Sequence, residues 1–241
     1  DLGIEVPYYD VPTIQKMLIK KANLKGIPVI TATQMLLSMT QNERATRAEI
    51  SDVANAVLDG TDVVMLSEES AVGEDPINVV DTMHNIIAKT EDIYNFDKQY
   101  KFPYLDEFDV IQATVTKLAD DLKANGILAI TSSGRSAQKM SRYRPRTPIF
   151  TFTHKKKVLN SLTAIWGVEP IGTIKEAQAS KMFQKMLKSL DEIGKLKKDG
   201  LYVATVGYPV GMPGSTNTIK ILTPSEIEYY LNFKEKEKKS K

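Results

Sequence analysis

Short runs of apolar residues alternate with amphipathic segments along the first third of the chain. Two runs have the length and character of buried strands, 29–32 and 62–67. Apolar residues at helical spacing predict three helices, 11–24, 46–58 and 77–94. Thr46 is followed three residues later by Glu49, which is the capping-box pattern of a helix start. Strands that alternate with helices in this order predict part of a parallel sheet or barrel.

The same alternation resumes beyond residues 95–107, an aromatic and charged stretch that contains Pro103 and shows neither period. We interpret that stretch as an interdomain linker. Further helices are predicted at 110–124, 135–143, 155–164 and 175–193, and further strands at 127–131, 149–153, 168–171, 202–206 and 218–222. Five strands with intervening helices predict a doubly wound α/β domain over 108–224. The terminal run KEKEKKSK predicts a charged tail over 225–241 that is solvated or disordered.

Composition narrows the class of protein without naming a chemistry. At 241 residues, of which 42% are apolar, the chain is long enough for one large barrel or two smaller domains. The formal net charge is +2 and the positive excess lies mainly at 234–241, which argues against a nucleic-acid or membrane-surface role. The lack of cysteine excludes disulfides and thiolate metal sites, and His84 and His154 are not spaced as metal ligands. No run approaches the roughly 18 apolar residues of a membrane span and no signal-peptide pattern opens the chain, so we expect a cytoplasmic protein.

Polar residues stand where each of the first two strands ends, and parallel sheets and barrels place their chemistry at such strand ends. Thr33 could orient or pass a proton in a water-poor cleft, or could simply satisfy local backbone groups. Ser67 is followed by Glu68 and Glu69, which predicts either a cation-binding neighbourhood or a solvated loop. Asp1, which opens the triplet DLG, could hold Mg²⁺ through one oxygen or could be an ordinary N-cap.

The densest candidate site is a hydroxyl-rich segment between a predicted strand and a predicted helix. It consists of Thr131, Ser132, Ser133, Gly134, Arg135 and Ser136. Backbone amides, hydroxyl donors and the helix start can converge there on one phosphate, with Arg135 adding charge. A serine-rich turn with an N-cap explains the same residues equally well. The Gly/Pro-rich loop 207–217, with Gly214 and Ser215, is expected at the same edge of the sheet, although every such connection needs turn residues.

Taken in order, five motifs of this sequence resemble the pyruvate kinase family across nearly the whole chain. They are DLGIEVP, PVITATQMLLSM, RATRAEISDVANAVLDGTDVVMLSEESAVGEDP, TSSGRSAQKMSRYRPRTPI and PGSTNTIKI. The resemblance implies that residues 1–94 are the last strands and helices of a (β/α)8 catalytic barrel. It also implies that 108–224 form the family's C-terminal regulatory, effector-binding domain.

The resemblance further implies a reaction and the residues that take part in it. The family transfers the phosphoryl group of phosphoenolpyruvate to ADP in glycolysis, giving pyruvate and ATP, with Mg²⁺ or Mn²⁺ and usually K⁺. Asp1 is similar to the magnesium-binding aspartate, which also touches the substrate, and Thr33 to the threonine implicated in enolate protonation. Ser67 matches a serine that supports the active site. The family is cytoplasmic and tetrameric, so we expect a homotetramer for the complete protein.

Two departures from the family pattern limit what the resemblance implies. Glu68 stands where many members have glycine, so the backbone there can differ. The stretch before Lys197 and Lys198 lacks the arginine with which some members hold the second phosphate of fructose 1,6-bisphosphate, so a sugar monophosphate or nucleotide monophosphate is an equally open effector. The family's K⁺ ligands and its phosphoryl-stabilising lysine would precede Asp1. We therefore expect the isolated chain to be inactive as an enzyme, and its autonomous role to be that of a phosphometabolite-binding module.

Overall fold

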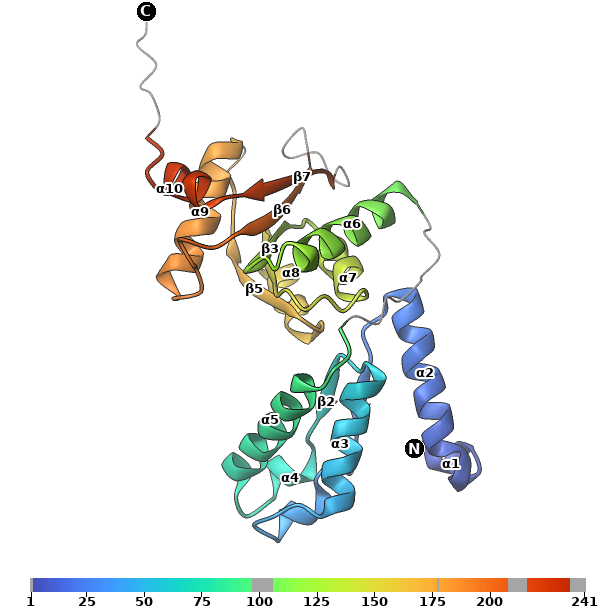
Figure 1. The fold of residues 1–241 in the computed structure, drawn as a ribbon. Helices are drawn as coiled ribbons and strands as arrows, with labels where there is room; N and C mark the ends of the chain where they lie inside the picture. Colours follow the sequence, from blue (N-terminus) through green and yellow to red (C-terminus); the bar gives the residue numbers. More distant parts are fainter. Residues whose placement is uncertain (1, 97–105, 177, 208–215, 235–241) are drawn as a thin grey trace, which may run out of the picture. The chain divides into compact units, whose positions relative to one another are not determined.

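The computed structural model describes residues 2–96, 106–176, 178–207 and 216–234. The chain divides into two compact units, Asp1–Lys98 and Gln99–Lys241. Each unit is described by itself below (Figure 1). Within the described residues, no helix is both long enough and apolar enough to cross a membrane.

The first unit contains a pair of short parallel strands and the helices that follow them. Its elements are α1 (Leu2–Glu5), η1 (Tyr8–Asp10), α2 (Val11–Lys25), β1 (Ile30–Ala32), η2 (Leu37–Thr40), α3 (Arg47–Asp59), β2 (Val63–Met65), α4 (Glu68–Ala71) and α5 (Pro76–Asp92). The strands pair in parallel, with Ile30 opposite Val63. The predicted capping box is present, because Thr46 accepts from the Glu49 amide and Glu49 accepts from the Thr46 amide.

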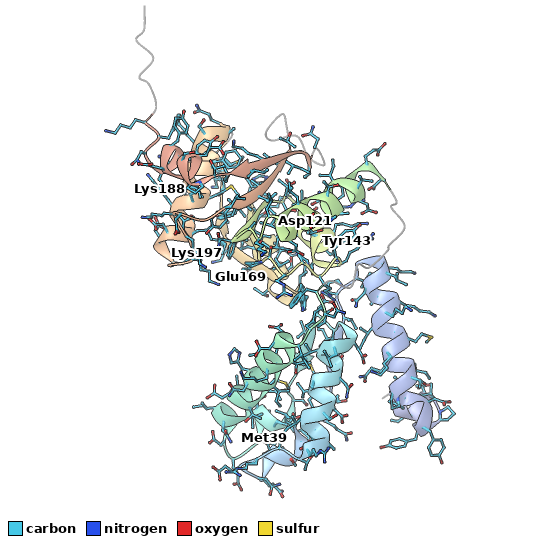
Figure 2. The ribbon with its side chains drawn as sticks, in the orientation of Figure 1. Met39, Asp121, Tyr143, Glu169, Lys188 and Lys197 are labelled. Carbon is cyan, nitrogen blue, oxygen red and sulfur yellow. The ribbon has the colours of Figure 1, made fainter. Side chains whose placement is uncertain are left out.

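Only one face of this two-stranded sheet is covered in the described structure. A core of Met35, Leu36, Met39, Val53, Ala56, Val79 and Met83 joins the segment after β1 to α3 and α5; Figure 2 labels Met39. On the strands themselves, Ile30 is 54% exposed and Met65 is 39% exposed. A parallel sheet normally buries both faces, so the exposed face is what a partial barrel would present.

The second unit is a five-stranded sheet with helices on both faces. Its elements are α6 (Glu107–Asp121), β3 (Gly126–Ile130), α7 (Arg135–Ser141), β4 (Ile149–Thr153), α8 (Lys156–Ser161), η3 (Leu162–Ala164), β5 (Val168–Thr173), α9 (Ala179–Glu192), β6 (Tyr202–Gly207), β7 (Thr216–Leu222) and α10 (Pro224–Leu231). The strand order is β5-β4-β3-β6-β7, parallel except for β7, which runs antiparallel to β6. The expected doubly wound sheet is therefore confirmed, with an antiparallel last strand as the difference.

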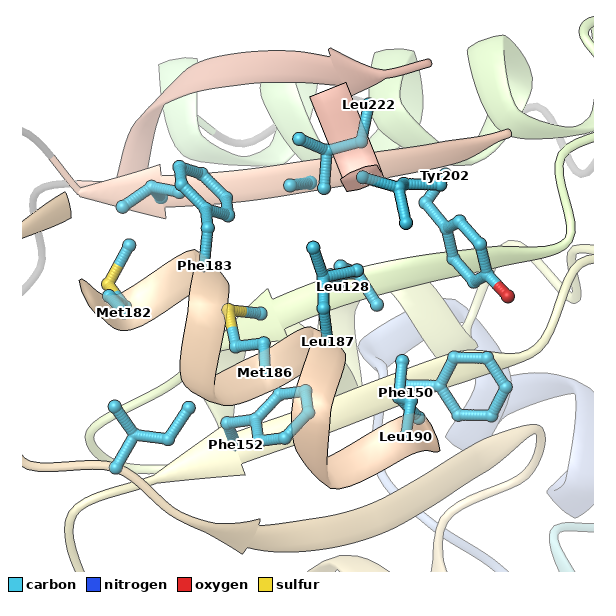
Figure 3. Packing of buried hydrophobic residues seen from close by; sticks show 14 residues of the cluster. Leu128, Phe150, Phe152, Met182, Phe183, Met186, Leu187, Leu190, Tyr202 and Leu222 are labelled. Atoms are coloured by element: carbon cyan, nitrogen blue, oxygen red, sulfur yellow. The ribbon is translucent and has the colours of Figure 1, made fainter. Parts of the chain in front are cut away.

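Alternate residues along each strand pack against opposite faces of the sheet. Leu128 and Phe150, neighbours across β3 and β4, lie in the core formed with α9 and α10. Figure 3 shows α9 crossing the strands with Met182, Phe183, Met186, Leu187 and Leu190 directed at them. Ile127 and Ile149, one position away, lie in the second core with α6 and α7. This alternation explains why β3 and β4 read as continuous apolar runs.

The end of the chain differs from the predicted charged tail. Residues Pro224–Leu231 form helix α10, which begins with a capping box between Thr223 and Glu226. Ile227 is completely buried in the core beneath it. The charges of the final residues dominated the prediction, whereas the Thr-x-x-Glu signature and one buried isoleucine suffice to fold this segment onto the domain.

Candidate active site

The two strand tips of the first unit line one pocket, as their predicted position at the ends of parallel strands requires. The pocket has a volume of about 290 Å³ and is lined by Thr33, Gln34, Leu37, Ser67, Glu68 and Glu69. Thr33 follows β1 and Ser67 follows β2, so the carboxyl ends of both strands open into it. Two of the candidate residues are thereby brought together.

The backbone at the end of β1 is held in an unusual conformation. Thr33 has φ 72° and Gln34 has φ 56°, so two successive residues other than glycine lie in the left-handed region. Such a φ is a genuine outlier for a β-branched residue, and its strain persists only where surrounding contacts impose it. Ser67 has φ −135° and ψ −99°, which is also irregular. Strain at both strand tips is typical of a site whose side chains must be presented in one direction.

Glu69 is the residue of this site whose role the sequence did not reveal. It is 1% exposed, whereas the neighbouring Glu68 is exposed. Its Oε1 accepts from the Leu36 amide at 3.1 Å and its Oε2 from the Ser67 amide at 2.8 Å. Burial acts to raise the pKa of Glu69, but hydrogen bonds from the backbone amides of Ser67, Glu69 and Leu36 outweigh it and hold the pKa below the ordinary value. The predicted solvated loop is therefore correct for Glu68 and wrong for Glu69.

Glu49 holds the same loop from the start of α3. Its carboxylate accepts from the Ser38 amide at 2.7 Å and from the Ser38 hydroxyl at 2.5 Å, and also from the amide and hydroxyl of Thr46. Burial acts to raise the pKa of Glu49, but the bonds from Ser38 and Thr46 together lower it. The loop after β1 is thus fixed at Leu36 by one carboxylate and at Ser38 by another.

The described residues do not by themselves provide a magnesium site. No group of three or more His, Asp or Glu that could hold a metal ion occurs among them. Both oxygens of Glu69 already accept backbone hydrogen bonds, which leaves Glu68 as the other carboxylate lining the pocket. Asp1, the predicted magnesium ligand, lies outside the described residues. The predicted metal role of Asp1 therefore stays a prediction.

The hydroxyl-rich segment of the second unit lies where the sheet changes direction. The chain passes from β3 to β4 on one side and returns from β5 to β6 on the other, so the end of β3 is a topological switch point. Ligands of open α/β sheets bind at such points. Thr131 is buried and its hydroxyl accepts from the Gly134 amide at 2.9 Å, while Gly134 has φ 89° and forms the N-cap of α7. The segment is therefore a tight turn at the position expected of a ligand loop.

The side chain of His154 approaches this turn. Ser132 Oγ lies 3.1 Å from His154 Nε2, and His154 Nδ1 lies 3.2 Å from the Ile174 carbonyl oxygen. Because the carbonyl can only accept, Nδ1 donates to it, which leaves Nε2 facing the Ser132 hydroxyl. No local pattern indicates this contact, because Ser132 and His154 meet only when β3 and β4 pair.

Arg135 is engaged elsewhere in this structure. Its Nη2 lies 3.2 Å from Asp106 Oδ2, and its guanidinium lies 5.1 Å from the centre of the Phe108 ring. Ser136 Oγ lies 3.4 Å from Thr216 Oγ1, which joins the turn to the start of β7. Gly214 and Ser215 lie outside the described residues, so their predicted part in phosphate binding stays a prediction.

Comparison with known proteins gives the same family for both units. A family model described as pyruvate kinase, barrel domain, matches residues 1–80, and one described as pyruvate kinase, alpha/beta domain, matches residues 109–222. The pyruvate kinase of Lactobacillus delbrueckii subsp. bulgaricus is 42% identical over 227 residues, covering 92% of this chain and 38% of that protein. The pyruvate kinase of Clostridium acetobutylicum is 43% identical over 225 residues, covering 92% of this chain and 48% of that protein.

A solved structure agrees with these sequence relationships. The crystal structure of a pyruvate kinase from Cryptosporidium parvum has a TM-score of 0.83 and 33% identity, covering 92% of this chain and 45% of that chain. The chain thus has the architecture of an enzyme in which part of a catalytic α/β barrel is followed by a separate α/β domain. It belongs to the pyruvate kinase family, and it spans less than half the length of these relatives.

Proposed function

We propose that the protein carrying this chain is a pyruvate kinase, which transfers the phosphoryl group of phosphoenolpyruvate to ADP to give pyruvate and ATP. The observation that carries the proposal is the pocket in which Thr33 and Ser67 meet at the ends of two parallel strands, in a chain of this family. Mg²⁺ or Mn²⁺, K⁺, a cytoplasmic location and a homotetramer come with the proposal from the family alone.

Thr33 is proposed to handle the proton that reaches the enolate left by phosphoryl transfer. Thr33 lines the pocket and its backbone is held in a left-handed conformation. A hydroxyl can pass or orient a proton in a cleft although its own pKa would not make it a free base. Ser67 is proposed to support the site from the neighbouring strand, and Asp1 and Thr33 to contact the substrate.

The test is steady-state kinetics of the intact enzyme, with pyruvate formation coupled to NADH oxidation. Thr33→Ala is expected to lower kcat by about 10²- to 10⁴-fold, the usual contribution of a positioned proton-transfer group. Thr114→Ala, an exposed change on α6, is the control and should leave kcat unchanged. Unchanged kcat in Thr33→Ala would remove Thr33 from the mechanism, and an inactive parent enzyme would overturn the proposed activity.

The 241-residue chain alone is proposed to lack this turnover. Its described first unit pairs two strands and leaves one face of them exposed at Ile30 and Met65, whereas the catalytic barrel of this fold closes eight strands. The same coupled assay on the purified chain should give no NADH oxidation above the background without enzyme. Phosphoenolpyruvate-dependent ATP formation would contradict this proposal.

For the chain by itself, a second function is proposed: binding of a phosphorylated sugar or a nucleotide monophosphate by residues 131–136. The position of this turn at the switch point of the sheet favours it. Calorimetric titration of the chain with ribose 5-phosphate, glucose 6-phosphate, AMP and fructose 1,6-bisphosphate tests it. Saturable binding that is weakened in Ser133→Ala and Arg135→Ala but retained in Lys117→Ala is the expected result. No binding by any of the four would reject the proposal for the isolated chain.

A further inference from the structure

The carboxylate of Glu69 bridges two segments that are far apart in sequence. Its two oxygens accept from two backbone amides, Leu36 in the loop after β1 and Ser67 at the end of β2. Leu36 and Glu69 are separated by 33 positions along the chain. Each oxygen therefore holds one wall of the pocket that Thr33 and Ser67 line.

Burial makes this bridge strong and costly to remove. Glu69 is 1% exposed, and Leu36 is completely buried. Hydrogen bonds to a charged acceptor are roughly twice as strong as those between neutral groups, and a buried donor left without its acceptor carries the full cost of desolvation. An ionised carboxylate only accepts, so it can satisfy both amides at once. A glutamine of the same shape would turn an NH₂ group toward one of them.

The bridge also accounts for the strain at the end of β1. Thr33 and Gln34 both hold positive φ, which nothing in their own side chains favours. The restraint has to come from beyond them, and Leu36 is fixed three residues downstream of Thr33. Glu49 fixes Ser38 in the same loop, but it belongs to α3, and its carboxylate accepts from Ser38 and Thr46. Glu69 is therefore the contact that ties Thr33's loop to Ser67.

We propose that Glu69 is a positioning residue of the candidate active site: it sets the distance and direction of Thr33 relative to Ser67 by clamping the two strand tips. The inference rests on the proposed function for its catalytic consequence, and on the structure alone for the clamp. Glu69 itself does not touch the reacting atoms in this account. It acts through the backbone of Leu36 and Ser67.

The experiment compares Glu69→Gln with Glu74→Gln, an exposed change in the same loop region. Amide NMR of the 241-residue chain reads the clamp without any turnover. Glu69→Gln should move the amide resonances of Leu36 and Ser67 upfield and speed their hydrogen exchange, whereas Glu74→Gln should leave both unchanged. In the unaltered chain, these two amides should exchange more slowly than that of the exposed Gln34. This last measurement needs no variant and so does not depend on whether Glu69→Gln folds.

Steady-state kinetics of the intact enzyme measure how Glu69→Gln affects catalysis. Misplacement of a catalytic group by about 1 Å can cost on the order of 10²-fold, so Glu69→Gln should lower kcat by about 10- to 100-fold. The KM for phosphoenolpyruvate should change by less than about threefold, since the substrate's binding groups are not removed. The rate is taken per folded enzyme, with the folded fraction of each variant measured by circular dichroism, so that a loss of general stability alone would leave kcat per folded enzyme unchanged.

Each outcome decides one part of the proposal. Unprotected Leu36 and Ser67 amides in the unaltered chain would overturn the clamp, whatever the enzyme does. If the Leu36 and Ser67 amides respond to Glu69→Gln but kcat is unchanged, Glu69 has a structural role only. That result would overturn its proposed role in positioning Thr33. An intact parent enzyme without pyruvate kinase turnover would refute the proposed function, while the amide results would still judge the clamp.

Discussion

At the strand tips, the positions of the site residues could be predicted from the sequence, but their backbone conformation and burial could not. The change from a buried apolar run to hydroxyls at Thr33 and Ser67 marked these positions as candidates, and both line the pocket. The left-handed backbone of Thr33 was not predictable, because nothing in a threonine favours positive φ. The difference in burial between Glu68 and Glu69 was not predictable either. Both are glutamates at the start of α4, and Glu69 alone accepts a hydrogen bond from the distant Leu36 amide.

Because Thr33 has a left-handed backbone, its glycine variant should be more stable than its alanine variant, the opposite of the usual order. In an ordinary helix glycine is less stable than alanine by about 1 kcal/mol. At φ 72° a side chain with a Cβ is strained by about 1–2 kcal/mol and glycine is not. We therefore expect Thr33→Gly to be more stable than Thr33→Ala by roughly 1 kcal/mol. Native-state hydrogen exchange of the amides in α3 reports the free energy of unfolding of the first unit.

The control for this comparison is Asn85, an exposed position inside α5. There Asn85→Gly should be less stable than Asn85→Ala by about 1 kcal/mol, the opposite order. If the alanine variant is the more stable one at both positions, Thr33 does not hold a left-handed backbone in solution.

Whole elements were predicted best where an apolar period and a cap agree. The capping box fixed the start of α3, and the continuous apolar run fixed β4 at 149–153. The prediction for the segment after Thr223 was wrong because the charged residues at the end of the chain were extended back over it, although Ile227, Tyr230 and Leu231 pack against the core that includes α9. The segment after Thr33 forms only the 3-10 turn η2, and its Leu36 and Ser38 amides donate to the carboxylates of Glu69 and Glu49.

Helix α10 should contribute to the stability of the second unit as a packed element. Ile227 is completely buried, so Ile227→Ala should lower the free energy of unfolding by about 2–5 kcal/mol. Glu228→Ala, on the exposed side of the same helix, should change it by less than about 0.5 kcal/mol. Urea unfolding followed by the fluorescence of Trp166 measures both, since that tryptophan is the only one in the chain and lies in this unit. Equal free energies of unfolding for the two variants would show that residues 224–231 do not pack on the domain, as the predicted tail required.

Strand β3 should be intolerant of a side chain at Gly126. A Cβ built there would lie 2.4 Å from the Phe150 ring and 3.1 Å from the Tyr202 ring, both of them in the core beneath α9. Gly126→Ala should therefore lower stability by about 1–3 kcal/mol through overpacking. Gly172→Ala on β5, where a Cβ meets nothing within 4 Å, is the matched control. The same urea titration compares them, and a neutral Gly126→Ala would show that the two rings can move aside.

At the scale of the molecule, the chain consists of two units whose stabilities have different origins. The second unit has two apolar cores, one on each face of its sheet. The first has one apolar core and relies as well on carboxylates that hold its loops, Glu49 and Glu69. Buried carboxylates with lowered pKa values make stability depend on pH. In the first unit these carboxylates are Glu49 and Glu69, so its loops should respond to acid, as should the start of α10 in the second unit, where Lys220 and Thr223 lower the pKa of Glu226.

The acid response of the first unit follows from three glutamates. Because the pKa values of Glu49 and Glu69 lie below the ordinary 4.5, their contribution is fully present above that pH and is lost as the pH falls through the lowered values. Partial desolvation, together with the charge of Asp92, raises the pKa of Glu91, so its contribution has the opposite sign; because Glu91 is exposed, the destabilisation of the folded state at neutral pH is small.

Three variants separate these contributions in hydrogen exchange of the α3 amides between about pH 3 and 7. Glu69→Gln should lower the stability of the first unit by about 1.5–3 kcal/mol at pH 7 and by less at pH 3, which flattens the dependence on pH. Glu91→Gln should raise stability at pH 7 and leave it nearly unchanged at pH 3. Glu74→Gln, exposed in the same unit, should alter neither end. A pH dependence that stays as steep in Glu69→Gln as in the parent chain would show that the carboxylate bridging Leu36 and Ser67 is not ionised in the folded protein.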